Sequence, residues 1–375
     1  MKAQPMPDIS LTQSTAAGDD TCKQLAVIWQ QLLGIDSIGF HQNYFDLGGD
    51  SSIAVQLFAR IEQVFKVKLP LATLFEAPTI EELARLLHLE APAFGWSSLV
   101  AIQAAGLRPP IFCMHGAGGN ILIYRDLAHR LGPDQPFYGL QCPGLDGTRP
   151  PLTRIEEMAS LYVAEIRKVQ PHGPYFLGGY CMGGTVALEV AQQIQAQGER
   201  VALLALFDTM DWSKIPPASI WAKSYQYFER IVFHAANFFR LDYEGKIQFL
   251  KEKAQAFRAR IPVWRGMLIA GFHSRPRPDL PESLVLAQVW RTNDRACANY
   301  IPQPYAGPIV DFRPLRQYRV LDKPNAKWDK LAKGGQQIVV LPTYPAGMLV
   351  EPFVKYLAAE LEKSIDDAIR RYGAN

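Results

Sequence analysis

The stretch Gly179-Tyr180-Cys181-Met182-Gly183 is the strongest local indication of the fold of this chain. It places a cysteine between two glycines. The apolar residues 174–178 before it are typical of a short buried strand, and residues 185–197 after it have the pattern of a helix. The glycines permit a strained turn and a close approach of two backbones. The sequence therefore predicts a strand, a tight turn and a helix, with the cysteine exposed at the helix N-terminus.

A cysteine in this position is a candidate nucleophile. With serine in the middle, the pattern G-x-S-x-G is the nucleophile elbow of α/β-hydrolases, which this stretch resembles. The helix dipole favours the thiolate, so we predict that Cys181 is more ionised than a free thiol. The alternative for any single cysteine is a buried structural role.

Composition and charge exclude several classes of function. The 375 residues are 48% hydrophobic and 20% charged, as in ordinary globular proteins, and a net charge of +3 without a basic stripe argues against nucleic acid as the main partner. The five cysteines show neither metal-ligand spacing nor a disulfide framework, which suits the reducing cytoplasm. We find no signal peptide and no apolar run of membrane-spanning length, so no membrane partner is expected.

The chain divides into two folded parts. Residues 1–19 are polar and small and predict a flexible leader, residues 20–89 predict a small four-helix unit, and residues 90–97 read as a linker. From residue 98 to 375, short apolar strands alternate with amphipathic helices, which predicts a mostly parallel sheet. Residues 210–296 break this rhythm and predict a helical lid at the ligand-binding edge of the sheet. The expected strands are Leu99–Gln103, Pro110–Met114, Pro136–Leu140, Pro174–Leu177, Val201–Phe207, Pro308–Phe312 and Gln336–Leu341.

A second motif lies in the helical unit, where residues 45–51 read Phe-Asp-Leu-Gly-Gly-Asp-Ser. Ser51 follows two glycines at the start of a predicted helix, where free amides and the dipole stabilise a phosphodiester. Alone, the motif would be a plain helix cap. Within this unit it resembles the peptidyl carrier domain of non-ribosomal peptide synthetases, although Ser52 replaces the usual apolar residue. The resemblance implies that Ser51 carries 4′-phosphopantetheine, added by a phosphopantetheinyl transferase, and that an adenylation domain lies upstream.

The remainder of the chain resembles the thioesterase domain that ends such synthetases, a domain with an α/β-hydrolase fold. Residues 114–119, Met-His-Gly-Ala-Gly-Gly, follow a predicted strand, and the amides of Ala117 and Met182 would form the oxyanion hole. Asp208 directly follows the strand 203–207, where this family places its catalytic acid. A turn or helix cap is the alternative role for Asp208.

The chain departs from its family at the catalytic histidine. Residues 348–354 resemble the segment that follows this histidine, and the alignment puts Pro345 in its place. No histidine occurs after His273, which lies in the expected lid. His115 is the candidate substitute base because its motif holds it near the site, and His273 is a weaker candidate.

The two departures together predict a change of chemistry. A thiol can accept an acyl group without a histidine, whereas the missing base would leave water inactive towards the thioester. Because thioesters stabilise an adjacent carbanion, we hypothesise a Claisen-type condensation of two acyl units, cyclisation and release. The pattern resembles adenylation–carrier–thioesterase synthetases that join two aryl α-keto acids into furanones or quinones. The aromatic residues of the expected lid weakly support an aryl substrate; they are Trp212, Trp221, Tyr225, Tyr227, Phe228, Phe233, Phe238 and Phe239.

Two other functions stay open at this point. The domain would be a conventional thioesterase if it released its product by hydrolysis or macrocyclisation, with His115 as the base. It would be an interaction module for the carrier if Cys181 were inert. The elbow glycines, Asp208 and the His-Gly motif favour an enzyme.

Overall fold

A computed structural model describes residues 16–49, 51–88, 96–210, 246, 282–315, 328 and 331–372. The chain forms two compact units, one of residues 1–69 and 73–94 and the other of residues 70–72 and 95–375. These bounds follow the predicted division into a helical unit, a linker and a larger domain.

The first unit is helical, as predicted. It consists of α1 (Ala16–Leu33), α2 (Ser51–Phe65), α3 (Thr73–Glu76) and α4 (Ile80–Leu87), and α1 packs against both α2 and α4. Trp29 of α1 lies edge-on to Tyr44, with ring centroids 5.2 Å apart, and both side chains are buried. A capping box begins α4, where the Thr79 hydroxyl accepts from the Glu82 amide at 3.2 Å.

The expected leader is shorter than predicted. Helix α1 begins at Ala16, so residues 16–19 of the expected leader are helical, and residues 1–15 lie outside the described residues. Alanine has the highest helix propensity, and an ion pair between Asp19 and Lys23 at 3.2 Å supports the first turns. Thr15, a residue type favoured at helix N-caps, directly precedes this start in the sequence and could have marked it.

The second unit is built on the predicted, mostly parallel sheet. Its strands are β1 (Leu99–Gln103), β2 (Ile111–Met114), β3 (Phe137–Leu140), β4 (Tyr175–Tyr180), β5 (Val201–Phe207), β6 (Ile309–Pro314) and β7 (Gln336–Leu341). They are ordered β1-β3-β2-β4-β5-β6-β7, and only β1 pairs antiparallel with its neighbour. The carboxyl ends of the six parallel strands therefore share one edge, where such sheets place their sites.

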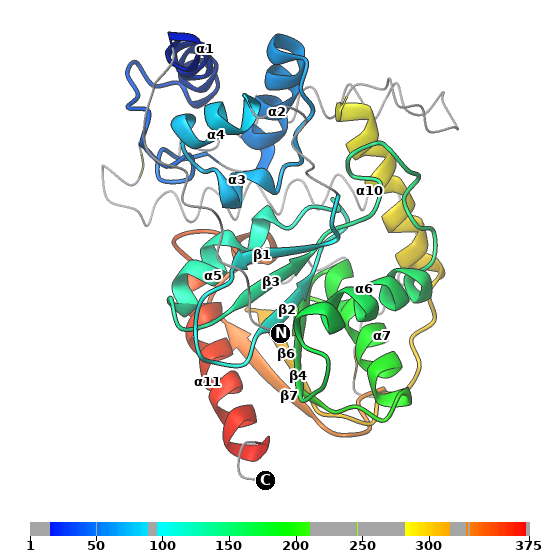
Figure 1. Ribbon diagram of the computed structural model, residues 1–375. Helices are drawn as coiled ribbons and strands as arrows, with labels where there is room; N and C mark the ends of the chain where they lie inside the picture. Colours follow the sequence, from blue (N-terminus) through cyan, green and yellow to red (C-terminus); the bar gives the residue numbers. More distant parts are fainter. Residues whose placement is uncertain are drawn as a thin grey trace. The chain divides into compact units, whose positions relative to one another are not determined.

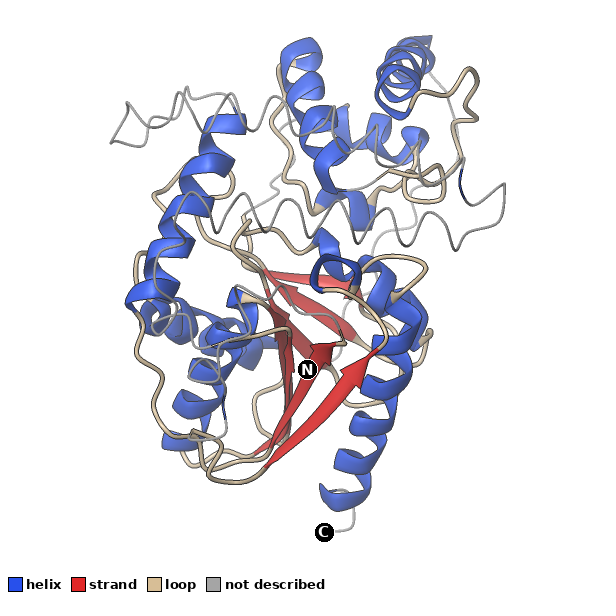
Figure 2. Cartoon of the chain, turned by 180° about the vertical axis from the view of Figure 1, so that it is seen from behind, coloured by secondary structure: helices blue, strands red, loops and turns tan. Residues whose placement is uncertain are grey.

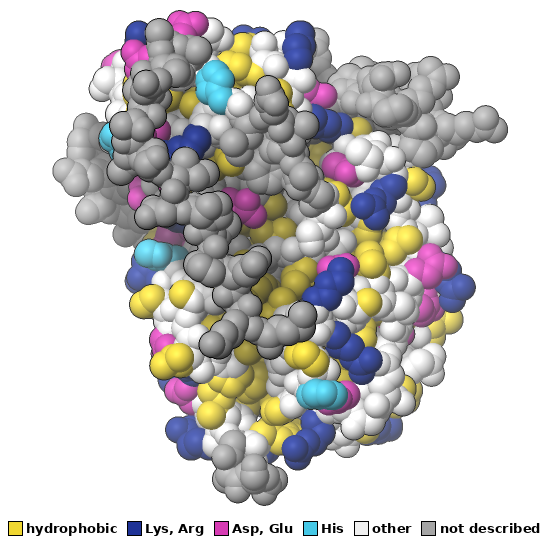
Figure 3. Space-filling view, in the orientation of Figure 1, with side chains coloured by type: hydrophobic (Ala, Val, Ile, Leu, Met, Phe, Trp, Pro, Cys, Tyr) yellow, Lys and Arg dark blue, Asp and Glu magenta, His cyan; other side chains and the backbone are white. Residues whose placement is uncertain are grey.

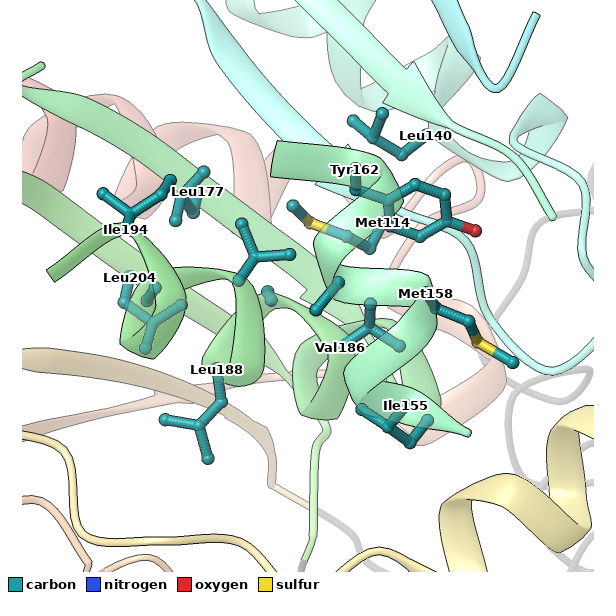
Figure 4. Packing of buried hydrophobic residues seen from close by; sticks show 14 of the residues in the cluster. Met114, Leu140, Ile155, Met158, Tyr162, Leu177, Val186, Leu188, Ile194 and Leu204 are labelled. Carbon is teal, nitrogen blue, oxygen red and sulfur yellow. The ribbon is translucent and has the colours of Figure 1, made fainter. Parts of the chain in front are cut away.

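Helices cover both faces of this sheet (Figures 1 and 2). On one face α6 (Ile155–Val169) packs on α7 (Met182–Ala196), and on the other α5 (Arg125–Leu131), preceded by η1 (Leu122–Tyr124), packs on α11 (Val354–Tyr372). The main core lies under α6 and α7, where Met114, Tyr162 and Val186 pack together (Figure 4). This dry layer holds the strand ends at fixed positions.

Only the last part of the lid expected over residues 210–296 lies within the described residues. Its last part is α10 (Glu282–Asn299), which packs against α7 and buries Val285, Val289 and Ala296. This apolar stripe assigns the helix to the body of the domain. Apart from Lys246, residues 211–281 lie outside the described residues.

In the described part of the chain, no helix combines the length and apolarity needed to cross a membrane. On the face drawn in Figure 3, lysine and arginine side chains are scattered among acidic ones.

Candidate active site

Cys181 occupies the turn that joins β4 to α7, so the strand–turn–helix prediction is confirmed. Its backbone has φ 56° and ψ −117°, a strained conformation for a residue with a side chain. The Cys181 amide donates to the Phe207 carbonyl at 2.9 Å, which continues the β4–β5 ladder by one residue. The fold therefore holds the thiol at the carboxyl edge of the sheet despite the local strain.

The glycines of the motif are required by close backbone contacts. A Cβ at Gly179 would lie 2.2 Å from the carbonyl carbon of Gly183. A Cβ at Gly183 would lie 2.2 Å from the Met114 carbonyl oxygen. These contacts explain why α7 begins at Met182, three residues before the predicted start, since the first turn packs directly on the ends of β2 and β4.

Asp208 lies on the neighbouring strand end, immediately after β5. It too has a positive φ, 46°, and its amide donates to the Phe312 carbonyl at 2.9 Å. The residue that accepts from the Cys181 amide, Phe207, directly precedes Asp208. Cys181 and Asp208, the predicted nucleophile and acid, are thus one strand apart at the same edge.

The predicted ionisation of Cys181 is wrong. Burial, followed by the negative charge of Asp208, raises the pKa of the Cys181 thiol well above its usual value. The Met182 amide hydrogen-bonds to the sulfur and lowers this pKa, but by less than these effects raise it. Sequence analysis recognised the helix N-terminus and could not foresee the desolvation.

The loop after β2 contains Ala117, whose amide is one of the two expected oxyanion donors. The Gly116 carbonyl accepts from the Gly119 amide at 2.9 Å and from His115 Nδ1 at 2.7 Å. Because a trans peptide is planar, fixing this carbonyl also fixes the direction of the Ala117 N–H. The other expected donor is the amide of Met182, the first residue of α7.

His115 is engaged on both ring nitrogens. Its Nε2 lies 2.7 Å from the Tyr162 hydroxyl, opposite the Nδ1 contact with Gly116. The side chain is fully buried, and burial lowers the pKa of His115 to about 4, so the imidazole is neutral at pH 7. These bonds hold residues 115–119, which we call the oxyanion loop. To act as a base in catalysis, His115 would have to break one of these two hydrogen bonds.

Pro345 lies in the turn that follows β7, at the start of η5 (Pro345–Gly347). Its ring is buried, and its carbonyl accepts from the Tyr180 hydroxyl at 3.0 Å. Tyr180 directly precedes Cys181, so this bond ties position 345 to the elbow. The turn therefore reaches the site although no imidazole is present at its tip.

Two residues near the site were missed by sequence reasoning. Tyr180 carried no signal beyond its place inside the motif. Asn293 could have been found, because it is a polar residue at a position of the apolar stripe of α10, eight residues after Val285 and four after Val289. His273 and the aromatic residues of the expected lid lie outside the described residues.

In the helical unit, Ser51 is the first residue of α2, as predicted. Gly48 has φ 87° and open space around the position of a Cβ, whereas a Cβ at Gly49 would lie 2.4 Å from the Tyr44 ring. The loop is thus anchored on the core by one glycine and left uncrowded at the other. The position of Ser51 at the N-terminus of a helix fits a serine-linked 4′-phosphopantetheine, because the helix dipole favours a phosphate there.

Two family models match the chain. A model described as a phosphopantetheine attachment site matches residues 23–87, and a model described as a thioesterase domain matches residues 109–230. The first covers the unit that contains Ser51, and the second covers β2 to the region after Asp208.

Relatives and a solved structure agree with these models. The chain is 40% identical over 210 residues to a dimodular nonribosomal peptide synthase of Bacillus subtilis (strain 168), which covers 55% of this chain and 9% of that protein. It is 33% identical over 209 residues to atromentin synthetase invA5 of Paxillus involutus, which covers 54% of this chain and 21% of that protein. The holo form of AB3403, a four-domain nonribosomal peptide synthetase bound to AMP and glycine, matches with a TM-score of 0.56 and 25% identity over 96% of this chain and 27% of that one. The chain thus spans only about a tenth to a fifth of the length of these two curated relatives.

Proposed function

We propose that this chain condenses two acyl units through a thioester on Cys181. The premise is that the chain comprises the carrier and thioesterase domains of a non-ribosomal peptide synthetase-like enzyme. When 4′-phosphopantetheine is attached to Ser51, it supplies the thiol that holds an acyl group as a thioester. The proposed partners are an upstream adenylation domain, which selects the acyl group, and a phosphopantetheinyl transferase. A nucleophilic thiol needs a reducing environment, so the proposed location is the cytoplasm.

The observation that carries the proposal is the pairing of a cysteine at the elbow with a proline where the base would stand. A serine hydroxyl without a base is nearly inert, whereas a thiol is the better nucleophile even when only a small fraction is ionised. The proline carbonyl is bonded to Tyr180, so the turn after β7 offers no proton acceptor of the kind that a histidine supplies. This combination supports acyl transfer to Cys181 and disfavours activation of water.

The first proposed step is an exchange of one thioester for another. The sulfur of Cys181 forms a bond to the incoming acyl carbonyl carbon, and the bond from that carbon to the donor sulfur breaks. The proton of the Cys181 thiol ends on the departing sulfur, so no net charge forms. The developing oxyanion would accept hydrogen bonds from the Ala117 and Met182 amides. The raised pKa of the thiol is tolerable here because the leaving group is itself a thiol.

The second proposed step forms a carbon–carbon bond. A methylene carbon next to a carbonyl group of a second acyl thioester loses its proton and bonds to the carbonyl carbon held by Cys181; in an aryl α-keto acid this methylene lies between the ring and the keto group. The bond from the Cys181 sulfur to that carbonyl carbon breaks, and the sulfur takes up a proton, which regenerates the free thiol. Asp208, one strand away from the elbow, is the proposed group that orients this unit or takes the proton from the methylene. Cyclisation then releases the product.

We propose aryl α-keto acids as the acyl units. The similarity to atromentin synthetase supports this choice, although the chain matches only part of that protein. The finer resemblance, to furanone-forming synthetases such as ralfuranone synthetase, depends on the cysteine at the elbow and stays a prediction.

The test starts from the holo protein loaded with an arylpyruvyl group on Ser51. Intact mass should show transfer to Cys181, and the released product should contain two acyl skeletons. Monomeric acid or a macrolactone would instead identify a conventional thioesterase and return attention to His115. A Cys181 that takes up no acyl group would identify an interaction module. As the loading control, Ser51→Ala should not gain the phosphopantetheine mass, and a gain in that variant would contradict the attachment site.

A further inference from the structure

Asn293 is a polar side chain fully buried on the apolar face of α10. Its Nδ2 donates to the Ala117 carbonyl at 3.0 Å. Its Oδ1 accepts from the Cys142 thiol at 3.6 Å. A buried amide is stable only where its hydrogen-bonding groups have partners, so this side chain is held in one orientation.

The partners of Asn293 converge on the oxyanion loop. The Cys142 amide donates to the Gly119 carbonyl at 2.8 Å, so the residue that bonds to Asn293 Oδ1 also fixes the far end of the turn. Val289, one helical turn before Asn293, would lie 2.7 Å from a Cβ at Gly119. Helix α10 therefore contacts this loop through a hydrogen bond at Ala117 and through packing at Gly119.

The hydrogen bonds restrain both peptide planes that flank Ala117. His115 and the Gly119 amide hold the Gly116 carbonyl, which shares its plane with the Ala117 N–H. Asn293 holds the Ala117 carbonyl, which lies in the following plane. The first plane sets the direction of the Ala117 N–H, and the bond from Asn293 keeps the adjoining plane from rotating against it. Without Asn293, the adjoining plane can rotate, and the Ala117 N–H then depends on the bonds from His115 and the Gly119 amide alone.

We propose that Asn293 is a positioning residue for acyl transfer, which it supports by holding the Ala117 amide in the direction that a tetrahedral oxyanion requires. This inference rests on the proposed role of Cys181 and assigns a function to the buried face of α10. It predicts a specific defect, because formation of an acyl-enzyme needs an oxyanion donor whereas alkylation of the same thiol does not.

The experiment compares two reactions at Cys181 in the full chain. Acylation by phenylacetyl-N-acetylcysteamine thioester and alkylation by iodoacetamide are followed by mass spectrometry, with Cys181→Ala as the blank. We expect Asn293→Ala to slow acylation about tenfold to a hundredfold, since loss of a whole oxyanion donor costs about 10²–10³. Alkylation should stay within about twofold of the native rate. Asn293→Asp keeps an acceptor for Cys142 and replaces the donor by a carboxylate oxygen, which repels the Ala117 carbonyl, so it should slow acylation selectively by at least as much.

Val289→Ala is the matched control, because it removes packing from the same helix and the same loop but no hydrogen bond. Both of its rates should stay near those of the native protein. Equal slowing of acylation and alkylation in both Asn293 variants, or unchanged acylation, would overturn the proposal.

Amide hydrogen exchange of residues 115–120 provides a readout that does not depend on the nucleophile. Exchange in this segment should be at least about tenfold faster in Asn293→Ala than in Val289→Ala. If the native protein were alkylated but never acylated, the proposed function would fail while this exchange still tested the positioning. Equal exchange in the two variants would refute it.

Discussion

The turn after β4 and the turn after β7 meet at the same edge of the sheet, yet they keep different parts of a hydrolase site. The first retains a strained residue, Cys181, and the glycine contacts that an elbow needs. The second retains its path towards the elbow, through the bond from Tyr180 to the Pro345 carbonyl, but presents no imidazole. Backbone packing thus holds the proposed nucleophile in place. The expected base would depend on a single side chain at position 345, and proline at this position leaves the path of the turn unchanged.

The largest expected effect lies at the first turn. Cys181→Ala should abolish acyl transfer, and Cys181→Ser should lower it at least about a hundredfold, because Pro345 stands where the family's histidine would activate the hydroxyl. Intact mass after loading of Ser51 measures both, and each variant should leave the acyl group on the carrier domain. Substantial turnover by the serine variant would mean that another base serves this elbow.

The second turn can be tested by restoring what it lacks. Pro345→His should raise hydrolysis relative to condensation by about tenfold or more, since a positioned general base contributes about 10²–10⁴. The ratio of monomeric acid to condensed product is the measurement. Pro345→Ala is the control, because it removes the ring without adding an imidazole. An unchanged ratio in the histidine variant would contradict the account of the missing base.

The comparison also explains how much of this site could be predicted from the sequence. Cys181, Asp208 and the strands before them were predicted because short apolar runs and glycine spacing are local signals. The packing of α10 on α7 could not be predicted, because its apolar stripe matches a surface that only the folded α7 provides. The pKa of Cys181 was misjudged for a related reason: desolvation depends on residues that are distant in the sequence.

A smaller effect is expected from the titration of His115, the candidate substitute for the missing base, which directly follows β2. Unfolded His115 would bind a proton near pH 6.5, whereas the folded protein binds it only near pH 4. Between these values the unfolded state holds more protons, so stability is fully present above pH 6.5 and falls as the pH drops towards 4. The shift corresponds to roughly 3 kcal/mol of unfolding free energy.

Urea unfolding across this pH range tests that expectation, with His115→Gln as the control that lacks the titration. The native protein should lose stability more steeply than the variant between pH 6.5 and 4. Equal slopes would mean that His115 titrates normally in the folded state, and the case for it as the general base would then be strengthened.

The smallest expected effect separates the charge of Asp208 from its chemistry. Its carboxylate raises the pKa of Cys181, so Asp208→Asn should lower that pKa and speed alkylation by iodoacetamide about threefold at pH 8. If Asp208 also takes a proton during condensation, the same variant should form less product although its thiol is more reactive. Asp294→Asn is the matched control, because Asp294 raises the pKa of the same thiol less than Asp208 does, so alkylation should quicken less. Faster alkylation together with undiminished condensation would restrict Asp208 to an electrostatic role, and the base for the second step would have to be sought elsewhere.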